Sequence, residues 1–314
     1  MLIELIITLI GALLSVAFLT VSERNVMASI QRRRGPNIVG AYGLLQAVAD
    51  GAKLIFKDII IPIRANPVLF MAAPSLALLI SLVIWIFIPF SGTNYLTNFD
   101  LSLLFIYAVS SIGVYGIIWA GWSSNSKYAF LGSLRSSAQL ISYEVSMNLL
   151  LLPVAACSNS FNLLEIVATQ EKTIWYFIPL LPVFVVFFIS VLAETNRAPF
   201  DLPEAEAEIV AGYNIEYSAM TFALFFLAEY NNILWLSFVL SICFLGGWLF
   251  PFGLLPSSVL WLVFKACFIC FIIIKVRANY PRYRYDQLMR LGWKVFLPTS
   301  LGYLILTIGM FISF

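Results

Sequence analysis

Eight long apolar runs separated by shorter polar stretches dominate this sequence of 314 residues. A helix needs about 20 consecutive apolar residues to cross the hydrocarbon core of a bilayer. The pattern therefore predicts an all-α integral membrane protein, a single membrane domain over residues 1–314 with about eight transmembrane helices. The expected spans lie at about 2–21, 68–90, 102–122, 138–157, 174–193, 217–243, 257–276 and 294–313. Because Glu229, Asn231 and Asn232 interrupt the sixth run, we expect that helix to be shifted or broken there.

Basic residues divide unevenly between the two sets of loops. Fifteen of the 18 Lys and Arg residues lie in the loops after the first, third, fifth and seventh runs. Loops on the cytoplasmic or matrix side carry the excess of Lys and Arg, so these four loops are predicted to lie there and both termini on the other side. The inner loops include residues 22–67, an acidic loop at 194–216 and a basic loop at 277–293.

The first inner loop contains an amphipathic stretch from Tyr42 to Lys57. Its apolar residues recur at approximately helical spacing opposite Asp50, Lys53 and Lys57. The stretch therefore predicts an interfacial helix that lies along the membrane surface. Periodicity alone leaves open whether this helix is a plain anchor or part of a site. The apolar residues are Leu44, Leu45, Val48, Leu54 and Ile55.

Composition narrows the chemistry. Hydrophobic residues make up 61% and charged residues only 11%, which excludes a water-soluble monomer, and the net charge of +2 is too small to indicate nucleic-acid binding. The absence of His removes imidazole acid–base catalysis and His ligation of haem or zinc. Cys267 and Cys270 form a C-x-x-C among Phe and Ile, where packing is the favoured role. We therefore expect no metal, haem or flavin in this chain.

The stretch at 192–217 holds six acids against one base, Arg197. A solvated acidic loop is one interpretation. Against it, apolar residues are interleaved with the acids, and Glu204 and Glu208 are one helical turn apart. Mutual repulsion and partial burial both raise carboxylate pKa values, so a functional, partly buried cluster is favoured. Its acids are Glu194, Asp201, Glu204, Glu206, Glu208 and Glu216.

Two further acids, Glu144 and Glu229, lie within expected spans. Gln139, Ser142 and Ser146 fall on one side of the segment around Glu144 at helical spacing. A charge at mid-bilayer costs roughly 2.5–3.5 kcal/mol on insertion scales, so such residues usually face a bundle interior or a hydrated path. The alternative is a carboxyl group near the membrane surface paired with a base, and a polar track is favoured over it.

Four blocks of the sequence together resemble a known family. They are ERNVMASIQRRRGPNIVGAYGLLQAVADGAKLIFKD, SLRSSAQLISYEVSMNLL, LAETNRAPFDLPEAEAEIVAGYNIEYSAMTFALFFLAEY and RANYPRYRYDQLMRLGWKVFLP. In this order they are similar to the signature blocks of subunit 1 of respiratory complex I, the proton-pumping NADH:ubiquinone oxidoreductase. Two positions depart from the family: EAEAE stands where many members have EGESE, and Asp58 where Glu is usual. The acidic charges are kept at both.

The resemblance implies a subunit that roofs the membrane end of the quinone chamber, with NADH, flavin and iron–sulfur clusters in partner subunits. Ubiquinone would bind as substrate at the interface with those partners, which include the hydrophilic quinone-site subunits and adjacent small membrane subunits, all among membrane lipids. The quinone-binding positions implied are Arg24, Asp50, Arg197, Phe200 and Tyr213. The proton path implied comprises Glu144, Glu194, Asp201, Glu204, Glu206, Glu208, Glu216 and Glu229.

Two other functions remain open at this stage. An ion-path adaptor of a related membrane-bound hydrogenase-type complex would carry similar blocks. A secondary transporter would show an internal repeat, and the sequence has none that we detect. The expected location is the mitochondrial inner membrane, with a bacterial plasma membrane as the alternative.

The uneven charge distribution generates a topology prediction. Cysteines introduced in the loops at 30–40 and 277–290 should react with an impermeant reagent only from the matrix or cytoplasmic side, and cysteines at the termini only from the other. Labelling of positions 33 and 314 from the same side would mean that the number of spans is odd.

Overall fold

The computed structural model describes residues 2–92, 96–201, 212–250 and 256–313. Every regular element in these ranges is a helix. The α-helices are α1 (Leu2–Ile30), α2 (Gln46–Ile55), α3 (Pro67–Val83), α4 (Ser102–Ser123), α5 (Lys127–Ser158), α6 (Leu163–Lys172), α7 (Leu181–Glu194), α9 (Ala219–Phe244), α10 (Val259–Asn279), α11 (Tyr285–Leu291) and α12 (Leu297–Ser313). Short 3₁₀ turns lie at Ala41–Gly43, Ile84–Phe87 and Gly212–Asn214, and a π-helical turn at Gly292–Phe296 joins α11 to α12.

Among the described residues, seven helical segments are long and apolar enough to cross a membrane. The expected span at 174–193 is instead represented by α7, which has 14 residues and begins at Leu181 with Pro182 in its first turn. At 1.5 Å per residue, α7 is about 21 Å long, less than the roughly 30 Å hydrocarbon core. The all-helical membrane fold is confirmed, with seven full-length segments and one short one.

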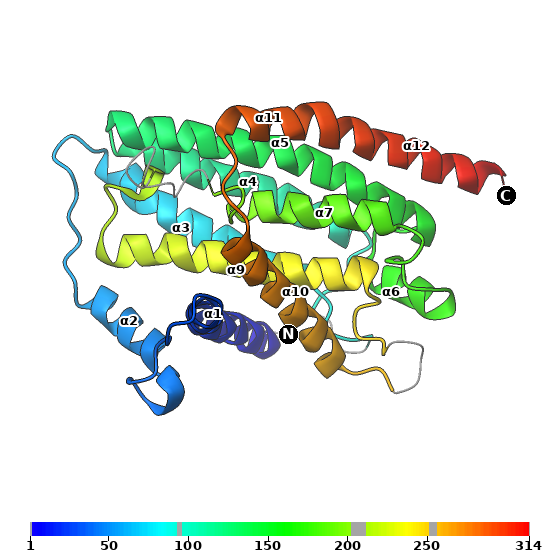
Figure 1. Cartoon of the computed structure of the whole chain (residues 1–314), viewed down its shortest axis with the longest axis horizontal. Coiled ribbons are helices and arrows are strands. Elements are labelled where there is room, and N and C mark those ends of the chain that lie inside the picture. The colour runs from blue at the N-terminus through cyan, green and yellow to red at the C-terminus, as the bar shows by residue number, and fades with distance from the viewer. Residues whose placement is uncertain (1, 93–95, 202–211, 251–255, 314) are drawn as a thin grey trace.

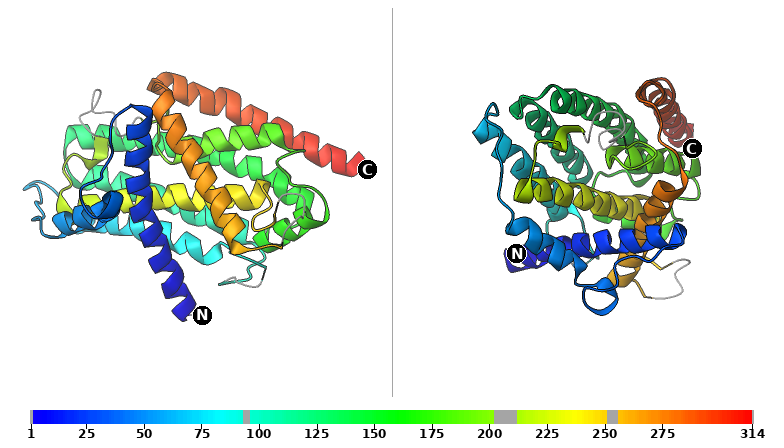
Figure 2. Two further views of the ribbon diagram at one scale, coloured as in Figure 1. Left: turned by 60° about the horizontal axis from the view of Figure 1, so that its bottom comes forward. Right: turned by 60° about the vertical axis from the view of Figure 1, so that its left-hand side comes forward.

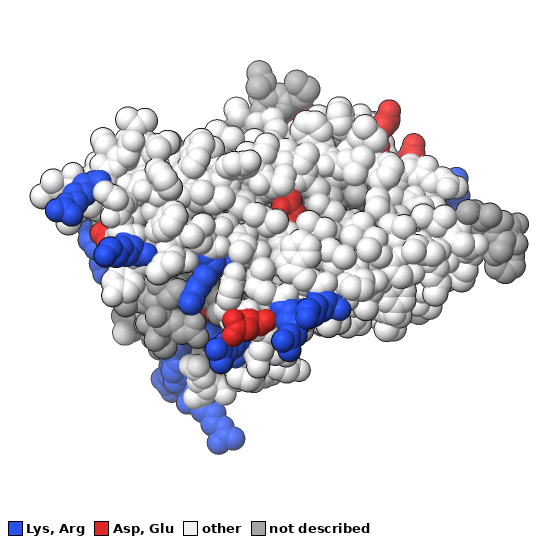
Figure 3. Space-filling model, turned by 90° about the horizontal axis from the view of Figure 1, so that it is seen from above, with Lys and Arg blue, Asp and Glu red and all other residues white. Residues whose placement is uncertain are grey.

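Helices α3, α4, α5, α7 and α9 run roughly side by side along the longest axis (Figure 1). Helices α1 and α10 cross α9 on one side of this group, whereas α12 lies against α5 on the other (Figures 1 and 2). Helix α2 lies at the inner end, close to α1 and α9. In Figure 3 most of the visible Lys and Arg side chains gather toward one end, and a broad uncharged surface covers the rest. That distribution matches a band that faces lipid.

Two helices extend further than their apolar runs. Helix α1 continues to Ile30, and α5 begins at Lys127, where the Ser126 hydroxyl accepts a hydrogen bond from the Ala129 amide at 3.3 Å. The polar side chains of this first part of α5 are compatible with a helix because several serines donate to carbonyls of the preceding turn. These are Ser133, Ser136 and Ser137, and the same pattern continues at Ser142 and Ser146.

The expected break in the sixth span is wrong, because α9 is continuous from Ala219 to Phe244. Its two asparagines use their side chains rather than interrupt the backbone. The indole N–H of Trp85 donates to Asn231 Oδ1 at 2.8 Å, and that of Trp235 donates to Asn232 Oδ1 at 2.9 Å. Polar side chains with such partners do not require a helix to open.

A glycine on α5 fixes how closely the segment before α9 approaches. A Cβ atom at Gly132 would lie 2.8 Å from Gly212 Cα and 3.0 Å from the Tyr213 amide nitrogen. Only the absence of a side chain allows this contact between two backbones. Gly132 therefore determines where Tyr213 lies.

Gly132→Ala should displace the turn at Gly212–Asn214 and destabilise the fold by about 1–3 kcal/mol, as overpacking does. The measurement is the midpoint of thermal unfolding of the protein purified in detergent. Gly302→Ala on α12 is the matched control, because a Cβ atom there meets no atom within 4 Å. Equal midpoints for the two variants would contradict the assigned packing.

Candidate functional site

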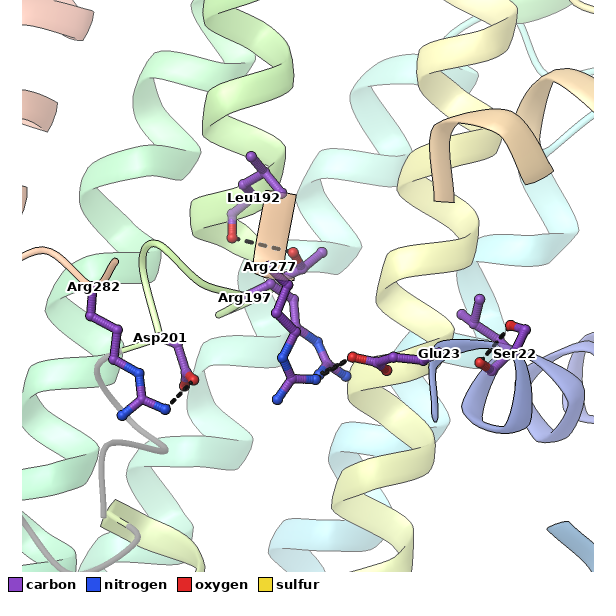
Figure 4. Close-up of polar contacts among 9 residues, drawn as sticks. Ser22, Glu23, Leu192, Arg197, Asp201, Arg277 and Arg282 are labelled. Carbon is purple, nitrogen blue, oxygen red and sulfur yellow. Dashed lines mark hydrogen bonds and ion pairs between the residues drawn. The ribbon is translucent and has the colours of Figure 1, made fainter. Parts of the chain in front are cut away.

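A buried cluster of charges joins three segments at the inner end of the bundle (Figure 4). Glu23 of α1 accepts hydrogen bonds from Arg197, with 3.3 Å between Nη1 and Oε1, and from Arg277 of α10. Glu23 is 6% exposed and Arg197 only 3%. The guanidinium of Arg197 also lies 4.5 Å from the centre of the Tyr230 ring on α9. Since a buried charge without a partner is costly, the three charged groups fix one another.

Asp201 lies a short distance from this cluster, at the end of the segment that follows α7 (Figure 4). Its buried carboxylate accepts a hydrogen bond from Arg282 at 3.1 Å. The neighbouring Phe200 lies in the packed core, with its ring 5.8 Å from that of Tyr143 and 5.6 Å from that of Tyr283. Contacts from α5 and from the segment after α10 therefore hold this stretch in place.

Gln139 of α5 organises the same stretch. Its amide nitrogen donates to the carbonyls of Ala193 and Phe200, both at 2.9 Å, and to Asn196 Oδ1 at 3.2 Å. One buried side chain thus satisfies three acceptors at the end of α7 and in the irregular segment that follows. The sequence places Gln139 among the polar residues of its span, but it does not reveal these partners.

A cavity of about 60 Å³ lies between α3, α4, α5, α7 and α9, next to the end of α7. Its volume is sufficient for a few water molecules. The Tyr213 hydroxyl donates to Glu229 Oε1 across its wall at 2.7 Å, and the Tyr213 ring packs against Phe225. The polar residues that line it are Ser110, Glu194, Asn196, Tyr213, Glu229 and Asn232.

Two buried carboxylates face this region without full hydrogen bonding. Glu144 Oε1 and Glu194 Oε2 have no hydrogen-bond partner within the described parts of the chain. Glu144 lies beside Ser110, which lines the cavity, and the charges of Glu144 and Glu194 act on each other. Buried polar atoms normally have partners, so such exceptions call for an explanation such as proton exchange or bound water.

Arg24 and Asp50 form a separate, more exposed pair between α1 and α2. Arg24 Nη1 lies 2.6 Å from Asp50 Oδ2, and Gln46 donates to the other carboxylate oxygen at 2.9 Å. Their side chains are 52% and 38% exposed. No residue of α2 is buried, and Leu44, Leu45, Val48 and Ile55 are exposed apolar side chains at this helix. This surface differs in kind from the closed cavity.

The structure thus brings Glu144, Glu194, Glu229 and Tyr213 around one cavity and places Arg197, Phe200 and Asp201 at its inner end. Glu216 is half-buried beside Tyr217, and burial raises the pKa of the Tyr217 hydroxyl to about 12, so that it keeps its proton at neutral pH. Glu204, Glu206 and Glu208 lie outside the described residues.

Sequence reasoning missed Glu23, Arg277 and Arg282. In the sequence the two arginines serve only as topology signals, and Glu23 is one acid beside Arg24. The usable signal is the position of Glu23 at the end of an apolar run, where an acid within helix reach of the hydrocarbon core requires a partner. Among the described residues, no group of three or more Cys, Asp or Glu is placed to hold a metal ion.

Comparisons with known proteins give a consistent result. A family described as NADH dehydrogenase matches residues 3–308. NADH-ubiquinone oxidoreductase chain 1 of Arabidopsis thaliana is 56% identical, over 99% of this chain and 97% of the relative, and that of Chondrus crispus is 54% identical, over 100% and 97%. A membrane relative from Paramagnetospirillum magneticum, named as part of an NADH-quinone oxidoreductase, is also 54% identical, over 99% and 92%. Similarity of this order extends over the full length, and the chain belongs to the NADH dehydrogenase family.

Proposed function

We propose that this chain is a membrane subunit of the proton-translocating NADH:quinone oxidoreductase, in which it forms the membrane part of the quinone chamber and an acidic path that couples quinone reduction to proton movement. The names of the relatives support the enzyme, with ubiquinone or another quinone as substrate. They favour it over a hydrogenase-type adaptor. The other subunits of the complex are the partners and supply the redox centres, and the membrane is the mitochondrial inner membrane or the bacterial plasma membrane.

One observation carries the coupling proposal: buried carboxylates continue from the inner end of the bundle into its interior. Asp201 and Arg197 lie at that end, Glu194 ends α7 at the cavity, and Glu229 lines the same cavity. Glu144 interacts with Glu194. A packed membrane core would gain stability from apolar residues at these positions, so their placement favours a role in proton movement.

The physical basis of the coupling is electrostatic. Reduction of a quinone to quinol takes up two electrons and two protons. A charge that forms or disappears near Arg197 and Asp201 acts strongly on neighbouring carboxylates, because the surroundings have a low dielectric constant. Closely spaced acids also titrate together rather than independently. A proton taken up at one carboxylate would therefore change the occupancy of the others.

Arg24 and Asp50 are proposed to contribute to the quinone entrance. They lie where α1, which crosses the membrane, meets α2, whose exposed apolar residues suit the membrane surface. A prenylated quinone needs an apolar route for its tail and a few polar groups for its head. The half-exposed ion pair beside an apolar interfacial helix offers both.

Replacing Glu194 by Gln tests the path. We expect Glu194→Gln to lower quinone-dependent NADH oxidation and proton pumping by about ten-fold or more, since a positioned acid or base contributes roughly 10²–10⁴-fold to proton transfer. NADH oxidation with an artificial acceptor, which bypasses this subunit, should persist. Both rates are measured on membranes that contain the assembled complex, with assembly verified on native gels.

The matched control is Glu165→Gln on α6, where the carboxylate is exposed and lies outside the cavity. That variant should pump and reduce quinone like the parent. If Glu194→Gln behaves in the same way as Glu165→Gln, the buried carboxylates are not part of the path.

A charge exchange tests the proposed entrance. An exposed ion pair contributes at most about 1 kcal/mol to stability, so Arg24→Asp and Asp50→Arg should each assemble normally but raise the KM for quinone several-fold. The double exchange restores the pair and not the individual positions. A normal KM in the double variant would show that the pair is purely structural, whereas a raised KM supports direct contact with the quinone route.

A further inference from the structure

A second cavity, of about 480 Å³, opens at the inner end of the bundle, where α3 and α5 begin and α4 ends (Figure 1). It shares no lining residue with the carboxylate cavity. Its size is within the range of roughly 300–1,000 Å³ that is typical of small-molecule sites. The side chains of interest on its wall are Arg64, Asn66, Trp122, Ser126, Lys127 and Phe130.

Hydrogen bonds between its two sides hold the cavity in shape. The Asn66 backbone amide donates to the Ser123 carbonyl at 2.9 Å, and the Asn125 side chain donates to the Arg64 carbonyl at 3.2 Å. Asn125 has a φ of 51°, in the left-handed region that Asn tolerates well. The segment before α3 is therefore tied to the turn between α4 and α5, and both walls of the cavity are fixed relative to each other.

The cavity carries positive charge without a matching acid. Arg64 and Lys127 are both exposed, and in the part of the chain that the structure describes neither forms an ion pair. The Asn66 side-chain amide and the Ser126 hydroxyl add N–H and O–H donors to the same wall. Such a set of donors and cations is suited to the oxygens of a phosphate group.

Aromatic residues place the cavity at the membrane surface. Trp122 is 63% exposed and Tyr128 64%, and the Trp122 ring packs edge-on against Phe130 at 5.9 Å between centroids. Exposed Trp and Tyr at the ends of spans are typical of the headgroup level of a bilayer. Trp122 and Phe130 give one wall of the cavity an apolar surface, on which the glycerol and the first methylene groups of a lipid can pack.

We propose that this cavity binds the phosphate headgroup of an anionic phospholipid from the inner leaflet. Basic pockets between membrane helices on the cytoplasmic or matrix side favour such headgroups. Arg64 and Lys127 bind the phosphate, and Trp122 and Phe130 contact the start of the acyl region. The site is separate from the quinone route and from the acidic path, so it can be tested independently of both.

The test uses the assembled complex in phosphatidylcholine vesicles that contain a photoreactive phosphatidylglycerol. After illumination, the label should map to the peptide that contains residues 122–130. Arg64→Gln combined with Lys127→Gln should lower labelling at this peptide by roughly five-fold for each charge removed. The control is Lys53→Gln combined with Lys57→Gln, which removes the same charge from the same side but not from the cavity.

Four outcomes decide the proposal. Loss of labelling in the Arg64/Lys127 pair but not in the Lys53/Lys57 pair supports it, and equal loss in both overturns it in favour of general surface charge. Displacement of the label by inorganic phosphate at millimolar concentration overturns the lipid as the occupant and indicates a free anion. Carbodiimide cross-linking of Lys127 to a carboxylate of another protein in the complex, with no lipid label, also overturns it.

Discussion

The buried carboxylate of Glu23 and its two guanidinium partners hold together the part of the protein on which the site depends. Arg197 and Arg277 reach it from segments 174 and 254 residues away in the chain. Removing one partner of a buried ion pair typically costs about 3–5 kcal/mol, because the remaining charge stays out of water. The end of α1, the inner end of α10 and the segment after α7 therefore behave as one body, and Asp201 and Phe200 take their positions from it.

Two kinds of polar residue fill the interior, and they differ in how their hydrogen bonds are met. The serines of α4 and α5 donate to their own helices, as Ser110, Ser136 and Ser146 do. They cost little in a membrane core and need no outside partner. Glu144 and Glu194 instead each keep a buried oxygen without a protein partner within the described residues. The polar side of α5 is thus less a continuous hydrophilic track than a row of satisfied hydroxyls beside a few reactive carboxylates.

Hydrophobicity located the membrane helices because it reports the thickness of the bilayer, and it failed at their ends for the same reason. Helix α5 begins eleven residues before its expected start at 138, where serines continue the helix through local hydrogen bonds. The acids of the site were visible as residues in unusual places. Their partners were not, since Tyr213 with Glu229 and Arg282 with Asp201 are pairs that only the tertiary fold creates. The family resemblance supplied roles that spacing alone does not encode.

The short length of α7 has an electrical consequence. Its 14 residues leave part of the bilayer thickness to the irregular segment that follows, and residues of that segment such as Thr195, Arg197 and Asp201 are buried in protein rather than exposed to lipid. Irregular backbone at this depth is tolerated only in such surroundings. A proton that reaches Glu194 has therefore already crossed a fraction of the transmembrane voltage, which is worth about 2.3 kcal/mol per charge for each 100 mV crossed. The occupancy of these carboxylates then follows the voltage of the membrane as well as its pH gradient.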